Sequence, residues 1–337
     1  MAIKGVLMQV SLTVWSITVA LVALLIIIDL FTSSRKPHDV KFKEAILWTL
    51  FYVGISIGFG NWVWSSYGSK FGTEFFAAYL VEYSLSIDNL FIFVIILAQF
   101  AVPSIFHQRV LLIGVVLALV LRAIFIAIGA AAISAFSFTF VIFGAILIWT
   151  GIGLFKHWDE DPDPNDNLLV RKIRSSIAMV DEFHGTKLFI RQDGKRFATP
   201  MFLVIIAIAS TDLLFALDSI PATFGVTQET FLVFSANAFA LLGLRALYFL
   251  LKGLLDKLVY LSLGLSIILM FIGVKLVLTF AHEEYAQIPK IPTVVSLGVI
   301  AGILAVSTIA SVIKSKSDPA AKAHAGRITA HDEENPQ

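Results

Sequence analysis

Two segments of the chain place carboxylates inside otherwise apolar stretches, and the spacing is the same in both. Residues 82–89 read EYSLSIDN and residues 212–219 read DLLFALDS. In each, an acid is followed six residues later by an aspartate and then by a small polar side chain. Because a carboxylate is costly inside a bilayer, acids in such surroundings are candidates for function. The two matching copies predict one cation site built from two halves.

Helix geometry decides which of these side chains can share a site. Residues seven apart lie on one face of a helix, and residues six apart point about 120° apart. Glu82 and Asn89 therefore lie on one face of their helix, as do Asp212 and Ser219, while the second acid of each motif points to the adjoining face. Pro221 disfavours regular helix just before itself, so a local break there would free carbonyl oxygens for the site. The predicted metal ligands are Glu82, Asp88, Asn89, Asp212, Asp218, Ser219 and Asn237.

These ligands are oxygen donors and amides, and the chain has no cysteine. Such a set suits Mg²⁺, Ca²⁺ or Mn²⁺, and several carboxylates balance a divalent charge. The alternative for each acid is a buried ion pair with Arg122, Arg245 or Lys275, which we expect to have structural or gating roles. These three bases cannot neutralise all of the intramembrane acids, so ion pairing alone does not explain them. No catalytic residue and no cofactor other than the transported cation are expected.

The composition is that of a helical membrane protein. The chain has 337 residues, of which 58% are hydrophobic, and an apolar run of about 20 residues is long enough to span a bilayer as a helix. We therefore predict an all-α membrane protein with about nine transmembrane helices, the first of which is a retained helix and not a signal peptide. The expected spans are 7–29, 45–65, 73–99, 110–131, 138–155, 200–221, 230–251, 258–280 and 292–313.

The third to fifth helices repeat as the sixth to eighth. Leu121-Arg122-Ala123 corresponds to Leu244-Arg245-Ala246, in the same order as the acidic motifs. Because each unit has three helices, the copies would cross the membrane in opposite directions, as in the inverted repeats of many secondary transporters. The predicted organisation is 1–71 (two N-terminal helices), 72–155 (first unit), 156–198 (charged cytoplasmic linker), 199–281 (second unit), 282–314 (ninth helix) and 315–337 (disordered cytoplasmic tail).

The distribution of basic residues predicts the orientation. The net charge is only +1, but most lysines and arginines gather on one side of the predicted spans, which the positive-inside rule assigns to the cytoplasm. The N-terminus is then outside and the C-terminus cytoplasmic, in the plasma (inner) membrane.

Other polar residues are weaker candidates. Asp29 and Glu74 lie close to predicted helix ends, where solvation at the interface explains them, and residues 282–284 are expected in a wet loop. The acidic run in the linker does not form a calcium loop, because Pro164 and Val170 occupy the positions that need glycine and glutamate.

At its motifs the chain resembles the TerC/Alx family of bacterial and plastid membrane proteins. The matching pieces are 85–91 (LSIDNLF), 215–222 (FALDSIPA), 242–248 (LGLRALY) and 271–275 (FIGVK). The resemblance implies a role in Mn²⁺ export and metal homeostasis, in a family named for tellurium resistance. It also implies that the cation site includes Glu82, Asp88, Asn89, Asp212 and Asp218.

Three positions depart from the family pattern. Tyr83 replaces a frequent lysine, Ala209 stands where a glutamate often precedes the second motif, and Gly153 occupies a position that can be lysine. One acid and two bases are absent, so ion selectivity or proton coupling can differ from that of better-known members.

The leading functional hypothesis is a secondary exporter of divalent cations, above all Mn²⁺. The alternative is a non-transporting membrane component of metal homeostasis or tellurium-stress resistance that scaffolds membrane or secreted proteins. An intramembrane aspartyl protease is disfavoured, because Asp88 and Asp218 lack flanking glycines and each has another acid nearby. The expected partners are the lipid bilayer and a divalent metal ion, and no nucleic acid.

Overall fold

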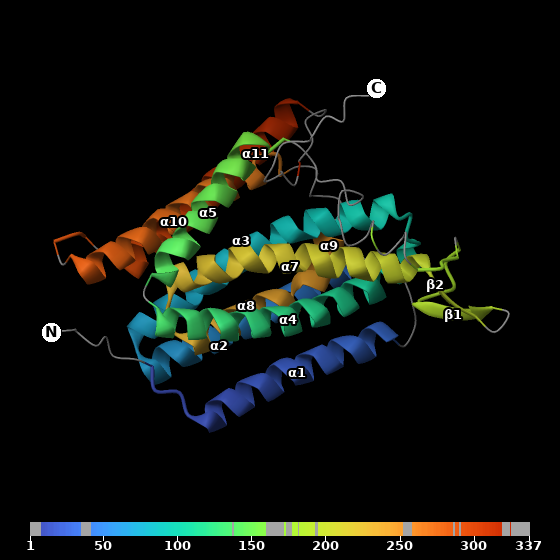
Figure 1. Ribbon diagram of the computed structural model, residues 1–337, viewed down its shortest axis with the longest axis horizontal. Coiled ribbons are helices and arrows are strands. Elements are labelled where there is room, and N and C mark those ends of the chain that lie inside the picture. The colour runs from blue at the N-terminus through green and yellow to red at the C-terminus, as the bar shows by residue number, and fades with distance from the viewer. Residues whose placement is uncertain are drawn as a thin grey trace. The chain divides into compact units, whose positions relative to one another are not determined.

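The computed structural model confirms a helical protein whose long helices are apolar. It describes residues 8–34, 42–136, 138–159, 172, 177–180, 182–192, 195–251, 258–285, 287–289, 291–318 and 324. Its elements are α1 (Leu12–Ser34), α2 (Phe42–Tyr67), α3 (Ser69–Gln99), α4 (Ser104–Ala135), α5 (Thr139–Lys156), β1 (Phe189–Gln192), β2 (Lys195–Ala198), α7 (Pro200–Val226), α8 (Thr230–Leu242), α9 (Leu244–Leu251), α10 (Leu261–Glu284) and α11 (Thr293–Ser317). Figure 1 labels them along the chain.

Eight of the described helices are long and apolar enough to cross a membrane, one fewer than the sequence predicted. The difference lies in 230–251, which forms the shorter helices α8 and α9 on either side of Gly243. Glycine lowers helix propensity, so an interruption there is physically reasonable. The opposite orientation of the two repeat units stays a prediction.

The chain divides into two compact units. The first contains residues 1–130 and 163–252, and the second contains 131–162 and 253–337. The first two helices of each predicted repeat therefore belong to the first unit, while the third helix of each, α5 or α10, belongs to the second. This division differs from the predicted domain boundaries, which kept each repeat together.

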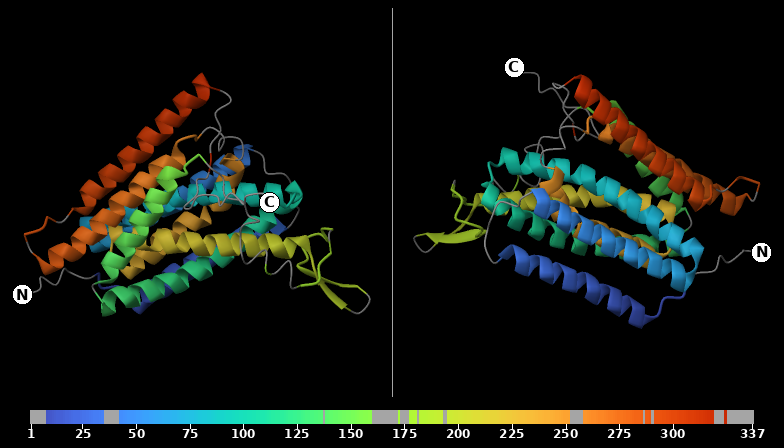
Figure 2. Two further views of the ribbon diagram at one scale, coloured as in Figure 1. Left: turned by 45° about the horizontal axis from the view of Figure 1, so that its top comes forward. Right: turned by 180° about the vertical axis from the view of Figure 1, so that it is seen from behind.

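In the first unit, α3 packs against α2, α7, α8 and α9. Figures 1 and 2 show α3 and α7 side by side. Aromatic side chains fill the space between α2, α3 and α8: the ring of Phe59 lies 5.3 Å from that of Phe75 and 4.6 Å from that of Phe239. This packing fixes the helix that carries the first acidic motif.

α7 carries the second acidic motif and is continuous through Pro221 to Val226. The predicted break before this proline is therefore wrong. Membrane helices tolerate proline where neighbouring groups satisfy the freed backbone. The Ser219 carbonyl lies 2.9 Å from Thr223 Oγ1, which can donate a hydrogen bond to it.

The second unit is a small bundle in which α10 packs against α5 and α11. Glycines allow α5 and α10 to approach closely: a Cβ atom added to Gly144 would lie 2.8 Å from the Gly273 carbonyl oxygen, and one added to Gly151 would lie 2.9 Å from that of Ser266. Small residues at helix contacts are typical of membrane bundles, where close packing replaces the hydrophobic effect.

The linker contains one element that the sequence analysis did not predict. β1 and β2 pair antiparallel, with Phe189 opposite Ala198 and Gln192 opposite Lys195. Figures 1 and 2 show this hairpin just before α7. The acidic run of the linker and most of the predicted C-terminal tail lie outside the described residues.

Candidate functional site

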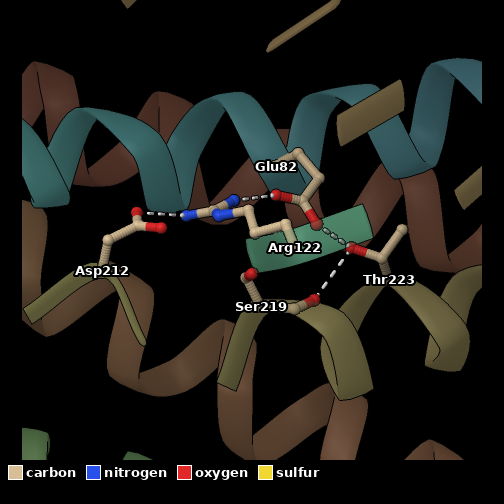
Figure 3. Close-up of polar contacts among 5 residues, drawn as sticks. All are labelled: Glu82, Arg122, Asp212, Ser219 and Thr223. Atoms are coloured by element: carbon tan, nitrogen blue, oxygen red, sulfur yellow. Dashed lines mark hydrogen bonds and ion pairs between the residues drawn. The ribbon is translucent and has the colours of Figure 1, made fainter. Parts of the chain in front are cut away.

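A buried arginine joins the two acidic motifs. Arg122 of α4 donates from Nη1 to Glu82 Oε2 of α3 at 2.9 Å, and from Nη2 to Asp212 Oδ1 of α7 at 3.4 Å. The side chains of Arg122 and Glu82 are 0% exposed and that of Asp212 is 3% exposed. Figure 3 shows the guanidinium between the two carboxylates. The first acid of each motif thus reaches one place, as the sequence predicted, but a cation of the protein itself lies between them.

Two further side chains complete the contacts. Thr223 of α7 donates from Oγ1 to Glu82 Oε1 at 2.5 Å. The single hydroxyl proton of Thr223 can serve either Glu82 or the Ser219 carbonyl, so these two bonds are alternatives. The amide of Asn89 is oriented so that both of its polar atoms are hydrogen-bonded. Its oxygen accepts from Arg122 Nη2 at 2.9 Å, and its nitrogen donates to the Leu85 carbonyl at 3.0 Å.

Several buried polar atoms of this cluster have no hydrogen-bond partner among the described residues. They are Ser86 Oγ, Asp212 Oδ2, Ser219 Oγ, Arg122 Nε and both amide atoms of Asn237. Asn237 of α8 lies next to Glu82, at a geometry too loose for a hydrogen bond. Buried polar groups are normally paired, so this concentration of unpaired oxygens is the most unusual feature of the site.

The remaining predicted ligands are placed less fully. Asp218 of α7 is half-buried, one residue before Ser219. The side chain of Asp88 lies outside the described residues, although its backbone is part of α3. In the part of the chain that the structure describes, no three Asp, Glu or His side chains come close enough to hold a metal. A metal site built from the carboxylates of both motifs therefore stays a prediction. Glu82 and Asp212 instead form the alternative arrangement, a buried ion pair with Arg122.

Arg245, the repeat counterpart of Arg122, forms a second buried ion pair. Its Nη2 donates to Asp29 Oδ1, which also accepts from the Tyr52 hydroxyl at 3.0 Å. Asp29 is only 5% exposed. The expectation that Asp29 is solvated at a helix end is wrong, because α1 continues to Ser34 and places this residue more than a turn inside the helix.

Glu74 is also buried, so the expectation that it is solvated at a helix end is wrong as well. It is 7% exposed, and its Oε2 accepts from the hydroxyl of Thr227 at 2.7 Å. The reason is again helix length, since α3 begins at Ser69 and not near residue 73. Buried carboxylates therefore extend along α3 beyond the acidic motif.

The other singled-out residues lie in the second unit. Lys275 is buried in α10, and its structural or gating role stays a prediction. His282 is half-buried at the end of α10, and its Nδ1 donates to the Ile288 carbonyl at 2.6 Å. It is thus held by the backbone and not simply placed in a wet loop; the side chains of Glu283 and Glu284 lie outside the described residues.

Comparison with known proteins agrees with the motifs. The family described as "Integral membrane protein TerC family" matches residues 67–319, which is most of the chain and includes Glu82, Arg122 and Asp212. The chain belongs to the TerC family. It is therefore an integral membrane protein with multiple apolar helices.

Relatives of similar length support the assignment to the TerC family. An uncharacterized membrane protein of Myxococcus xanthus is 40% identical over 93% of this chain and 96% of its own length. Another, Rv2723 of Mycobacterium tuberculosis, is 42% identical over 88% of this chain and 78% of its own. Alx of Escherichia coli, described by name as a membrane-bound redox modulator, is 38% identical over 88% of this chain and 92% of its own. No solved structure matches.

One of the three departures from the TerC pattern lies beside the site. Tyr83 follows Glu82 on α3 and its ring stacks on that of Tyr79, with 5.6 Å between ring centres. A lysine at this position would place an additional positive charge next to the acidic motif. This protein has an aromatic side chain there, and among the described residues Arg122 is the cation that contacts Glu82 directly.

Proposed function

We propose that this TerC family protein is a secondary transporter that exports divalent metal cations, with Mn²⁺ as the leading substrate. The observation that carries the proposal is the completely buried cluster of Glu82, Arg122 and Asp212, contributed by three different helices. Ionisable groups at such positions mark ion pathways, because their burial in the membrane is otherwise unfavourable.

The unpaired atoms support a cation as the ligand. Asp212 Oδ2, Ser86 Oγ and Ser219 Oγ are oxygens, and Asn237 adds an amide oxygen. Hard divalent cations prefer oxygen ligands, and no thiolate is present to favour a soft metal. The residues therefore fit Mn²⁺, Mg²⁺ or Ca²⁺, and the resemblance to the TerC/Alx family favours Mn²⁺ among them.

The export direction and orientation are part of the proposal. We place the N-terminus outside and the C-terminus in the cytoplasm of the plasma (inner) membrane, because the predicted cytoplasmic segments hold most of the lysines and arginines. No catalytic step is assigned to the protein. Thiol redox chemistry, which the name of Alx could suggest, is closed to this chain because it has no cysteine.

Transport is tested with the purified protein in liposomes. Uptake and release of Mn²⁺, Mg²⁺ and Ca²⁺ are measured for the unaltered protein and for Glu82→Gln and Asp212→Asn. Glu182→Gln, at an exposed position of the linker, is the matched control. The unaltered protein and the control should move Mn²⁺, and the two site variants should not. Absence of flux for every metal would refute the proposal.

One observation favours the second candidate, a non-transporting scaffold in metal homeostasis or tellurium-stress resistance. Arg122 already neutralises part of the charge on Glu82 and Asp212, as a permanent structural pair would. If that is its whole role, the protein should bind partner proteins in the membrane without moving metal. Metal-dependent co-purification of a defined partner, combined with the absence of flux in liposomes, would support this candidate.

A further inference from the structure

The guanidinium of Arg122 occupies the position that a bound cation would need. It contacts three of the seven predicted metal ligands, at 2.9 Å from Glu82, 2.9 Å from Asn89 and 3.4 Å from Asp212. Figure 3 shows it lying between the two carboxylates from α3 and α7. A metal ion that binds both carboxylates must therefore replace these contacts.

We propose that Arg122 is a tethered counter-cation, which fills the ion site when no metal is bound and offsets part of its negative charge while the carrier returns. This inference rests on the proposed transport function and adds to it the state of the site between two transported ions. The arginine cannot leave the protein, so it exchanges with the metal at the carboxylates in every cycle.

The charges give the reason for such a residue. An exporter must return to its starting state after releasing its ion, and this return carries Glu82 and Asp212 through the membrane interior. Two buried carboxylates without a cation are strongly unfavourable. With Arg122 between them the three groups have a formal net charge of −1 instead of −2. The protein itself thus supplies one of the two missing positive charges.

The contacts of Arg122 are also suited to release. Each carboxylate receives a single hydrogen bond from the guanidinium and not the paired fork that makes arginine–carboxylate contacts strongest. Arg122 Nε and Asp212 Oδ2 lack partners among the described residues. The guanidinium therefore uses only part of its five N–H donors, and a divalent cation competes with a weakened pair.

Unpaired oxygens are available to the incoming ion. Ser86 lies four residues after Glu82, on the same side of α3, and its Oγ has no partner in the described structure. Ser219, drawn beside Arg122 in Figure 3, likewise has an unpaired Oγ. A permanent ion pair gives no reason to leave these oxygens unsatisfied. A site that binds the guanidinium and a metal ion in turn does give a reason, because each of the two cations leaves unused some of the ligands that the other one binds.

The decisive experiment separates net flux from exchange in liposomes. Net flux is uptake of radiolabelled Mn²⁺ into metal-free vesicles, and exchange is its uptake into vesicles that contain unlabelled Mn²⁺. Exchange does not require the empty carrier to return. The unaltered protein should perform both. Arg122→Gln should keep exchange but lose at least about tenfold in net flux, which corresponds to about 1.4 kcal/mol in the barrier. Arg122→Lys should restore net flux, because it restores the charge.

Net flux that stays equal to that of the unaltered protein in folded Arg122→Gln would overturn the inference. Arg122→Lys keeps the inference testable even if the glutamine variant does not fold. A folded Arg122→Lys protein that exchanges Mn²⁺ but has lost net flux would also overturn the inference. If the unaltered protein shows neither exchange nor net flux, the proposed transport function itself has failed.

Discussion

Arg122 Nη1 donates to Glu82 Oε2 at 2.9 Å although neither side chain has any solvent exposure and the residues lie 40 positions apart in the sequence. The same guanidinium reaches Asp212, a further 90 positions along, at the longer distance of 3.4 Å. Typical N–H···O distances are about 2.7–3.2 Å. Glu82 is therefore the principal partner of the arginine and Asp212 the weaker one.

This asymmetry predicts a rank order of stability. Glu82→Gln removes the closer partner of a buried charge and should lower the free energy of unfolding by about 3–5 kcal/mol. Asp212→Asn removes the longer contact and should cost less. Thermal melting in detergent measures both, with Glu182→Gln, at an exposed site, as the control. An Asp212→Asn protein that melts below Glu82→Gln would contradict the assignment of Glu82 as principal partner.

The second ion pair allows a test of one hydrogen bond. Tyr52→Phe removes the hydroxyl that donates to Asp29 Oδ1 at 3.0 Å but leaves Arg245 in contact with the same oxygen. The expected loss of stability is about 0.5–1.5 kcal/mol. Arg245→Ala should cost clearly more, because it leaves a buried carboxylate without its counter-charge.

The matched control for this test is Tyr67→Phe. Tyr67 is half-buried and meets the ring of Trp62 edge to face, with 5.7 Å between ring centres. Both tyrosine variants are compared by thermal melting in the same detergent. If they melt at the same temperature, the Tyr52 hydroxyl does not contribute to the ion pair.

Much of the site could be predicted from the sequence, but its pairing could not. The duplicated spacing of acids identified Glu82 and Asp212, since a carboxylate in an apolar run is rare enough to be informative. Which cation faces them depends on how α3, α4 and α7 pack. No periodicity encodes a contact between residues 40 or 90 positions apart.

Helix ends explain why two acids are buried against expectation. The apolar runs end near Asp29 and begin near Glu74, which predicts interfacial positions, whereas α1 and α3 extend beyond these runs. Polar residues can continue a helix past its apolar part, so hydropathy alone places helix ends poorly. The hairpin of β1 and β2, by contrast, is indicated by the sequence. Asp193-Gly194 stands between its two strands, and Asp-Gly is a strong hairpin sequence.

Close packing of α5 on α10 predicts that a single methyl group is harmful. Gly144→Ala would place Cβ 2.8 Å from the Gly273 carbonyl oxygen and 2.7 Å from Val277 Cγ2. Overpacking of this kind costs about 1–3 kcal/mol. Gly54→Ala is the control, because nothing lies within 4 Å of its added Cβ, and alanine is the better helix former by about 1 kcal/mol. The melting temperature of Gly144→Ala should fall below that of the unaltered protein, and that of Gly54→Ala should stay level or rise. Equal melting temperatures of the two variants would contradict the tight helix contact.

The last prediction concerns the second acid of each motif, Asp88 or Asp218. If the motifs form one shared site, Asp88→Asn and Asp218→Asn should each abolish Mn²⁺ binding, because neither half can replace the charge lost from the other. The double variant should bind no worse than either single variant, since residues that act as a unit are non-additive.

Calorimetry on detergent-purified variants measures this, provided each variant keeps the thermal melting of the unaltered protein. Glu182→Gln again serves as the control and should bind normally. Two independent sites would give a different result: each single variant would bind half as many ions, with unchanged affinity at the site that remains. That outcome would leave the duplication as architecture, and it would also remove the reason for a single arginine to serve carboxylates from both halves.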